Sequence, residues 1–99
     1  MSNTSKQSFE EMVAVLCGTS EPARMKKILS ELLTDAELED LVLRWRLLGQ
    51  LADGVPQREI SKNLGISLCK ITRGAKILKD DTSAVYSIFM GEGKSRSRT

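Results

Sequence analysis

Residues 57–79 carry six basic side chains and one acidic side chain, spaced as on a helix surface. Lysine and arginine pair with phosphates, and arginine also donates two hydrogen bonds to guanine in the DNA major groove. Pro56 precedes this segment and begins a short helix, Gly65 makes a turn, and Ser67 caps a second helix with a basic outer face. The segment therefore predicts a helix-turn-helix at about residues 57–79, the unit that presents one helix to the major groove.

The side chains predicted to contact DNA lie at the starts of these two helices and on their outer faces. They are Gln57, Arg58, Ser61, Leu68, Cys69, Lys70, Thr72 and Lys79. Small side chains can pack on a thymine methyl group, whereas hydroxyl and lysine groups hold phosphates. The competing interpretation is a surface helical hairpin with a solvated basic face and no ligand.

Charge is divided unevenly along the 99 residues. Residues 1–53 hold six bases and nine acids, a net charge of −3, and residues 54–99 hold nine bases and four acids, a net charge of +5. A concentrated basic segment favours a polyanionic partner, because neutralising phosphates releases condensed counterions. The chain has no apolar run of the roughly 20 residues that a membrane span needs, and no secretion signal begins it. We therefore expect a cytoplasmic protein without a membrane partner.

The composition argues against catalysis. The chain has no histidine, no glycine-rich phosphate loop and no cluster of cysteine and histidine residues. These absences predict a protein that is not an enzyme, with no catalytic residue, no metal site and no cofactor. The two cysteines, Cys17 and Cys69, are expected to be reduced thiols, with Cys17 packed in an apolar stretch.

Helical periodicity dominates the first half of the chain. A stripe ending at Cys17 predicts a first helix that Gly18 terminates, and Ser20 is expected to cap a second helix. Thr34 and Glu37 form a capping box before a third helix, which runs to about Asp53. The apolar face of that helix is predicted to comprise Leu38, Leu41, Trp45, Leu48 and Ala52, widened by Val42 and Leu51. A face this broad fits a central helix shared with a partner subunit.

The second half continues the helical pattern. The left-handed residue Gly54 ends the third helix. The side chains expected to point inward from the last three helices are Ile60, Leu64, Ile71, Ala75, Leu78, Val85, Ile88 and Phe89. The last helix is expected to begin near Thr82, and residues 92–99 form a basic tail predicted to be disordered. No strand is predicted, so we expect one all-α domain over residues 1–91.

Several short motifs carry a resemblance to a known family. Leu32-Leu33-Thr34, Arg44, Gln57-Arg58-Glu59 and Ile71-Thr72-Arg73-Gly74 resemble the bacterial tryptophan repressor, over residues 32–79. The resemblance implies an all-α, six-helix fold that forms an intertwined homodimer. It also implies a repressor of transcription that binds double-stranded operator DNA of tryptophan biosynthesis genes only when L-tryptophan, its corepressor, is bound.

The resemblance implies a binding site for L-tryptophan. Arg44 and Arg73 would enclose the indole ring, and Arg73 would also pair with the ligand carboxylate. Thr34 and the carbonyls of Leu32 and Leu33 would lie near the ammonium group. Gly74 would leave room for the ligand. These roles agree with the chemistry of guanidinium groups, which stack on aromatic rings and pair with carboxylates.

The residues alone leave alternatives open. Helical spacing puts Arg73 away from Ile71, Ala75 and Leu78, which favours a phosphate contact for Arg73. Gly74 inside a helix is explained either by ligand approach or by close helix packing. The competing functions are a regulator of the same fold that does not use tryptophan, and a dimeric helical module that binds a protein.

Overall fold

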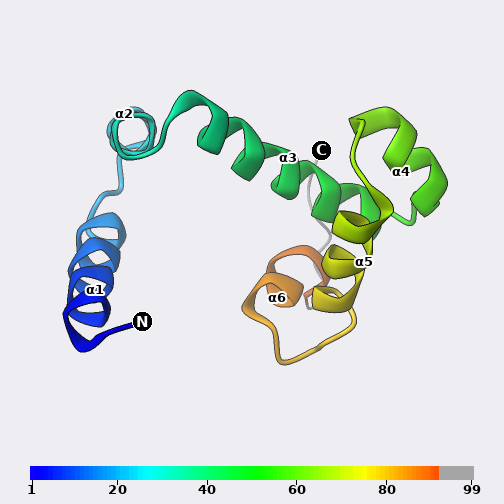
Figure 1. Cartoon of the computed structure of the whole chain (residues 1–99). Helices are drawn as coiled ribbons and strands as arrows, with labels where there is room; N and C mark the ends of the chain where they lie inside the picture. Colours follow the sequence, from blue (N-terminus) through cyan, green and yellow to red (C-terminus); the bar gives the residue numbers. More distant parts are fainter. Residues whose placement is uncertain (92–99) are drawn as a thin grey trace. The chain divides into compact units, whose positions relative to one another are not determined.

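The computed structural model describes residues 1–91, and every regular element in that range is a helix. The six helices are α1 (Asn3–Cys17), α2 (Pro22–Leu32), α3 (Asp35–Ala52), α4 (Gln57–Leu64), α5 (Leu68–Ile77) and α6 (Ala84–Met90), as Figure 1 shows. The predicted all-α fold of six helices is confirmed. The predicted basic tail lies outside the described residues. None of the described helices has the length and apolar character that crossing a membrane requires.

The chain divides into two compact units, one from Met1 to Leu38 and one from Glu39 onward. In the first unit, α1 is capped by Ser2, whose hydroxyl accepts a hydrogen bond from the Ser5 N–H at 3.1 Å. The helix ends at Cys17, as Gly18 predicts. Cys17 is exposed, so its predicted packing role is wrong for the single chain. Neither α1 nor α2 buries a residue completely, which leaves their apolar stripes available to other surfaces.

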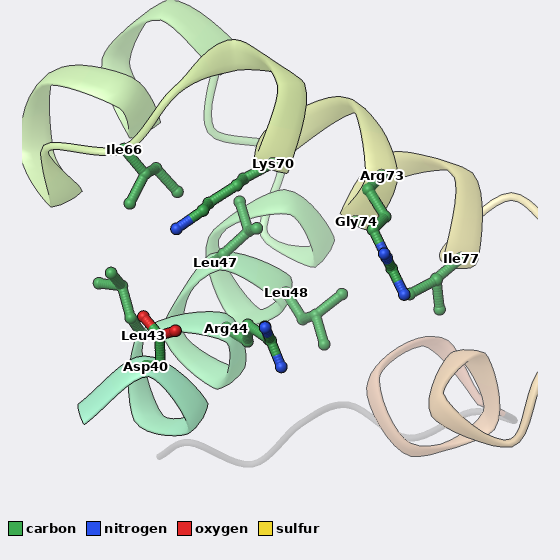
Figure 2. Close-up of a pocket in the computed structure, with 10 residues that line it drawn as sticks. All are labelled: Asp40, Leu43, Arg44, Leu47, Leu48, Ile66, Lys70, Arg73, Gly74 and Ile77. Carbon is green, nitrogen blue, oxygen red and sulfur yellow. The ribbon is translucent and has the colours of Figure 1, made fainter. Parts of the chain in front are cut away.

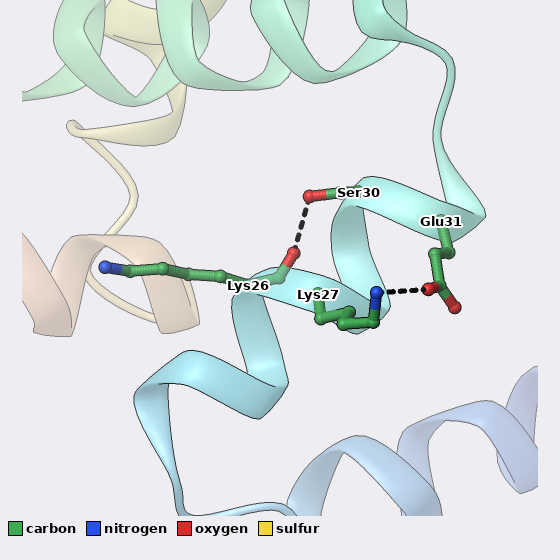
Figure 3. Close-up of polar contacts among 4 residues, drawn as sticks. All are labelled: Lys26, Lys27, Ser30 and Glu31. Carbon is green, nitrogen blue, oxygen red and sulfur yellow. Dashed lines mark hydrogen bonds and ion pairs between the residues drawn. The ribbon is translucent and has the colours of Figure 1, made fainter.

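The predicted cap of α2 is wrong. The residue before the helix is Glu21, not Ser20, and it makes no side-chain capping bond. Pro22 occupies the first turn, where its missing N–H has no intrahelical partner to lose. Further along α2, the Ser30 hydroxyl donates to the Lys26 carbonyl at 2.7 Å, and Lys27 pairs with Glu31 at 3.2 Å (Figure 3). This exposed pair contributes about 0.3–0.5 kcal/mol to helix stability.

The junction between α2 and α3 is the predicted capping box. The Thr34 N–H donates to Glu37 Oε1 at 2.9 Å, and the Glu37 N–H donates to Thr34 Oγ1 at 3.1 Å. Two of the backbone donors at this end of the chain's longest helix are thereby satisfied. At the other end of α3, Gly54 has a φ of 82°, which confirms the predicted left-handed stop.

The core of the second unit lies where α3, α4 and α5 meet (Figure 1). Its buried members are Leu47, Ile60, Ile66 and Ile71, with Leu43, Leu51, Val55 and Leu64 packed against them. Ile60 and Ile71 are completely buried, which confirms their predicted inward orientation. This core holds α5 against the C-terminal part of α3 and so determines the position of any site between them.

The apolar face predicted for α3 is packed only in part within the single chain, where Leu51 contacts the core. Leu41, Val42 and Trp45 are exposed, whereas Leu47 is buried. The core uses Leu43 and Leu47 on the neighbouring side of the same helix, together with Leu51. The helix is apolar on both faces, so its periodicity does not indicate which of them packs against α5. The exposed face remains available to a partner.

A tight turn connects α4 and α5. Gly65 has a φ of 64°, and its N–H donates to the Ser61 carbonyl at 2.9 Å. The Ser61 hydroxyl crosses the turn and donates to the Ile66 carbonyl at 2.8 Å. Ser67 then caps α5 by accepting the Lys70 N–H at 3.3 Å. The glycine turn and the serine cap predicted from the sequence are both confirmed.

The last helix is shorter than predicted and begins at Ala84, after the cap Ser83. Phe89 is buried, and its ring centroid lies 4.6 Å from that of Trp45. Ile88 is 56% exposed, so its predicted burial is wrong in the single chain. A helix of seven residues has a narrow inner face, which Phe89 occupies.

Before α6, Asp80 stabilises the turn that follows α5. Its carboxylate accepts hydrogen bonds from the hydroxyl and the N–H of Thr82 at 2.6 and 3.0 Å. The bond from the Thr82 hydroxyl, followed by that from its N–H, lowers the pKa of Asp80 below its usual value. The carboxylate therefore stays ionised around neutral pH, and its bonds to Thr82 weaken only in acid.

Candidate functional site between helices α3 and α5

A pocket of about 220 Å³ lies between α3 and α5, within the second unit (Figure 2). Its apolar lining comes from Leu43, Leu47, Leu48, Ile66 and Ile77, together with Gly74. Its charged lining comes from Asp40, Arg44, Lys70 and Arg73. An apolar cavity with a few convergent charged groups is the usual form of a small-molecule site.

Helical spacing explains why these side chains converge. Asp40 and Arg44 lie one turn apart on α3, and Leu47 and Leu48 follow on the same side. On α5, Lys70, Gly74 and Ile77 repeat at intervals of four and three residues. The pocket is therefore bounded by one continuous side of each helix.

The structure brings Arg44 and Arg73 to the same pocket. Both side chains are exposed, and Figure 2 shows both guanidinium groups extending from their helices on the side of Leu48 and Ile77. Arg73 lies three residues after Lys70 and four before Ile77, so these three side chains share the side of α5 that lines the pocket. The location that the resemblance implies is thus compatible with the helical spacing, while the ligand contacts themselves stay predictions.

Leu32, Leu33 and Thr34 belong to the other unit, and their role as ligand contacts stays a prediction. Leu32 is 56% exposed and Leu33 is half-buried. The Thr34 hydroxyl oxygen already accepts the Glu37 N–H, so it retains one further acceptor position and its own hydrogen.

Gly74 packs closely against two leucine side chains of α3. It is buried, and a Cβ at this position would lie 3.2 Å from both Leu47 Cδ2 and Leu51 Cδ1. Close helix packing is therefore sufficient to explain a glycine here. Because Gly74 also lines the pocket, ligand clearance stays a second predicted reason for it.

Replacement of Gly74 by alanine tests these two reasons separately. The new methyl group would press on the ends of two flexible leucine side chains, costing about 1–3 kcal/mol, while alanine favours the helix by about 1 kcal/mol. We expect a net loss in unfolding free energy of up to about 2 kcal/mol, measured by urea denaturation. A loss well above 3 kcal/mol would contradict the flexible response of the leucines. A folded variant with weakened ligand affinity would support ligand clearance.

The predicted DNA contacts lie mostly on exposed surface. Exposed members are Gln57, Arg58, Leu68, Cys69, Lys70, Thr72 and Lys79. Leu68 is 57% exposed at the first turn of α5, where its apolar side chain is accessible to a partner. Ser61 is half-buried, and its hydroxyl donates a hydrogen bond to the Ile66 carbonyl. The Thr72 hydroxyl donates to the Leu68 carbonyl, with 2.9 Å between the two oxygens. All eight stay predicted contacts, and the two hydroxyl oxygens remain available as acceptors.

Part of the pocket lining was not predicted from the sequence. Asp40, Leu43, Leu47 and Ile66 were not predicted there, and Lys70 was predicted only as a DNA contact. The four-residue interval between Asp40 and Arg44 was a usable signal, because it places both on one side of α3. In the described residues, no group of three or more potential metal ligands occurs.

Comparisons with known proteins agree on one family. The family model described as Trp repressor protein matches residues 7–92. A Trp operon repressor homolog of Xylella fastidiosa is 43% identical over 77% of this chain and 84% of its own length. Homologs of the same name from Pasteurella multocida and Aliivibrio salmonicida are 36% and 33% identical, over 74% and 83% of this chain and 72% and 78% of their own lengths. No solved structure gives a significant match. The chain therefore belongs to the Trp repressor protein family, a family of transcriptional regulators and not of enzymes.

Proposed function

We propose that this protein is a tryptophan-dependent repressor that acts in the cytoplasm on operator DNA of tryptophan biosynthesis genes. The observation that carries the proposal is that α5 takes part in two surfaces. Arg73 and Gly74 line the pocket against α3, while Leu68, Cys69 and Thr72 are exposed on the same helix. A ligand in the pocket would therefore contact the helix that is proposed to enter the major groove.

The pocket chemistry supports an aromatic amino acid as the ligand. Leu47, Leu48 and Ile77 offer apolar surface to a ring. Guanidinium groups such as those of Arg44 and Arg73 stack on aromatic faces and form paired hydrogen bonds with carboxylates. L-Tryptophan has both features, and the family name connects its members with the tryptophan operon.

The proposed mechanism is a shift in population between conformations. Without ligand, α4 and α5 would adopt several positions on α3, few of which fit DNA. Tryptophan between α3 and α5 would favour the position that fits the major groove, by as much as its affinity differs between the conformations. Linkage then requires operator DNA to raise the affinity for tryptophan by the same factor.

The exposed apolar surfaces support the proposed homodimer. Leu41, Val42 and Trp45 lie exposed on α3, and Phe9 is 51% exposed on α1. A second copy would cover such surfaces and stabilise a short chain. Two helix-turn-helix units in one dimer would then bind two half-sites one helical turn of DNA apart, a spacing of about 34–36 Å for which the tryptophan repressor is a standard example.

DNA binding with and without L-tryptophan tests this function. Duplexes selected from a random pool in the presence of tryptophan would serve as probes, with fluorescence anisotropy as the readout. We expect binding at least tenfold tighter with tryptophan than without it. For about 6–10 phosphate contacts, affinity is expected to fall by about 10³–10⁵ between 50 and 200 mM salt.

The same titrations separate the alternatives. Tight, salt-sensitive binding that ignores tryptophan would indicate a regulator of the same fold without this corepressor. Failure to enrich any duplex, together with retained dimerisation, would indicate a protein-binding module. A des-amino analogue serves as a control for recognition of the amino-acid group.

A further inference from the structure

We infer that Asp40 sets the charge selectivity of the pocket, favouring a zwitterionic amino acid over aromatic acids that carry no ammonium group. This inference rests on the proposed function and adds a residue to which the sequence assigned no role. Asp40 is the only acidic side chain among the residues that line the pocket. The other charged lining groups are the three bases Arg44, Lys70 and Arg73.

The three bases alone would favour the wrong class of ligand. A pocket lined by two guanidinium groups and an ammonium group attracts an aromatic carboxylate whether or not it carries an amine. An aromatic acid without the amine is an anion, whereas tryptophan has no net charge at neutral pH. A carboxylate in the lining repels the anion and attracts the ammonium of the amino acid, so it improves the discrimination between the two.

The placement of Asp40 fits this role. It precedes Arg44 by one helical turn, on the side of α3 that faces the pocket. Figure 2 shows the Asp40 carboxylate beside Leu43 and the Lys70 side chain extending from α5 across the same end of the pocket. No ion pair within 4.0 Å joins Asp40 to a base in the part of the chain that the structure describes, so its charge is available to a ligand.

Lys70 has the opposite effect at the same end of the pocket. Its ammonium group competes for Asp40 and favours anionic ligands. The two residues should therefore shift the ligand preference in opposite directions when their charges are removed. Simple loss of packing at either position would not produce such a pattern.

The test compares L-tryptophan with indole-3-propionate, which lacks only the ammonium group, by calorimetry on the full-length protein without DNA. Asp40→Asn is expected to lower the ratio of tryptophan affinity to indole-3-propionate affinity by roughly two- to fivefold, because Asp40 is exposed and solvent screens its charge. Lys70→Met is expected to raise the same ratio. Glu39→Gln is the matched control, since it removes an acid from the adjacent position of α3 that does not line the pocket.

An unchanged ratio in Asp40→Asn, or equal weakening of both ligands, would overturn the inference while leaving the proposed function intact. The same ratio change in Glu39→Gln would also overturn it, because the effect would then come from net charge alone. Wild-type protein that binds neither indole ligand would overturn the proposed function and this inference together. Circular dichroism of each variant establishes that the fold is retained.

Discussion

Replacement of Arg73 by alanine is expected to weaken L-tryptophan binding by roughly ten- to a hundredfold. Charge-assisted hydrogen bonds contribute about 1.5–3 kcal/mol, and every 1.4 kcal/mol is a factor of ten in affinity. Arg73 lines the pocket but is exposed, so the variant should unfold at nearly the same denaturant concentration as the wild type. Calorimetry measures the ligand affinity, and anisotropy at saturating tryptophan measures the DNA affinity.

The matched control is Lys76→Ala, which removes another exposed base from α5 that does not line the pocket. We expect this control to bind tryptophan normally. If Arg73→Ala instead keeps the wild-type tryptophan affinity and loses only DNA affinity, then Arg73 is a phosphate contact, as its helical spacing alone suggested. Arg44→Ala provides a second comparison, because Arg44 lies on α3 and has no predicted contact with DNA.

Local signals in the sequence predicted the ends of the elements well. The capping box of Thr34 and Glu37, the positive φ angles of Gly54 and Gly65, and the cap at Ser67 all depend on residues within four positions of one another. Such interactions are formed between residues close together in the chain, so a short stretch of sequence is enough to indicate them. Ser20 is an exception, because Pro22 already favours the start of α2 without a side-chain cap.

Periodicity did not predict which apolar side of α3 packs against the core. Leu43 and Leu47 form the core face, while Leu41 and Trp45 on the other apolar face remain exposed. A helix with two apolar faces can bury either of them, and the position of a second helix decides which one is buried. The location of Arg44 and Arg73 at one pocket could not be predicted from periodicity either, because no spacing rule relates residues on separate helices. That prediction came from the family resemblance.

The core itself supplies the second large expected effect. Ile71→Ala is expected to lower the free energy of unfolding by about 2–5 kcal/mol, because Ile71 is completely buried between α5 and the rest of the core. The matched control Leu68→Ala, on the same helix but 57% exposed, should cost about 0.5 kcal/mol or less. Urea denaturation at one fixed protein concentration measures both, since the stability of an oligomer depends on concentration.

The two variants should also differ in their affinities for tryptophan and DNA. Ile71→Ala loosens the attachment of α5 to α3, so we expect tryptophan and DNA affinities to fall together while the exposed side chains of α5 are unchanged. Leu68→Ala keeps the pocket and should bind tryptophan normally but contact DNA less well. Equal stability of the two variants would contradict the core described above. Normal tryptophan binding by a destabilised Ile71→Ala protein would show that the pocket does not depend on how firmly α5 is anchored.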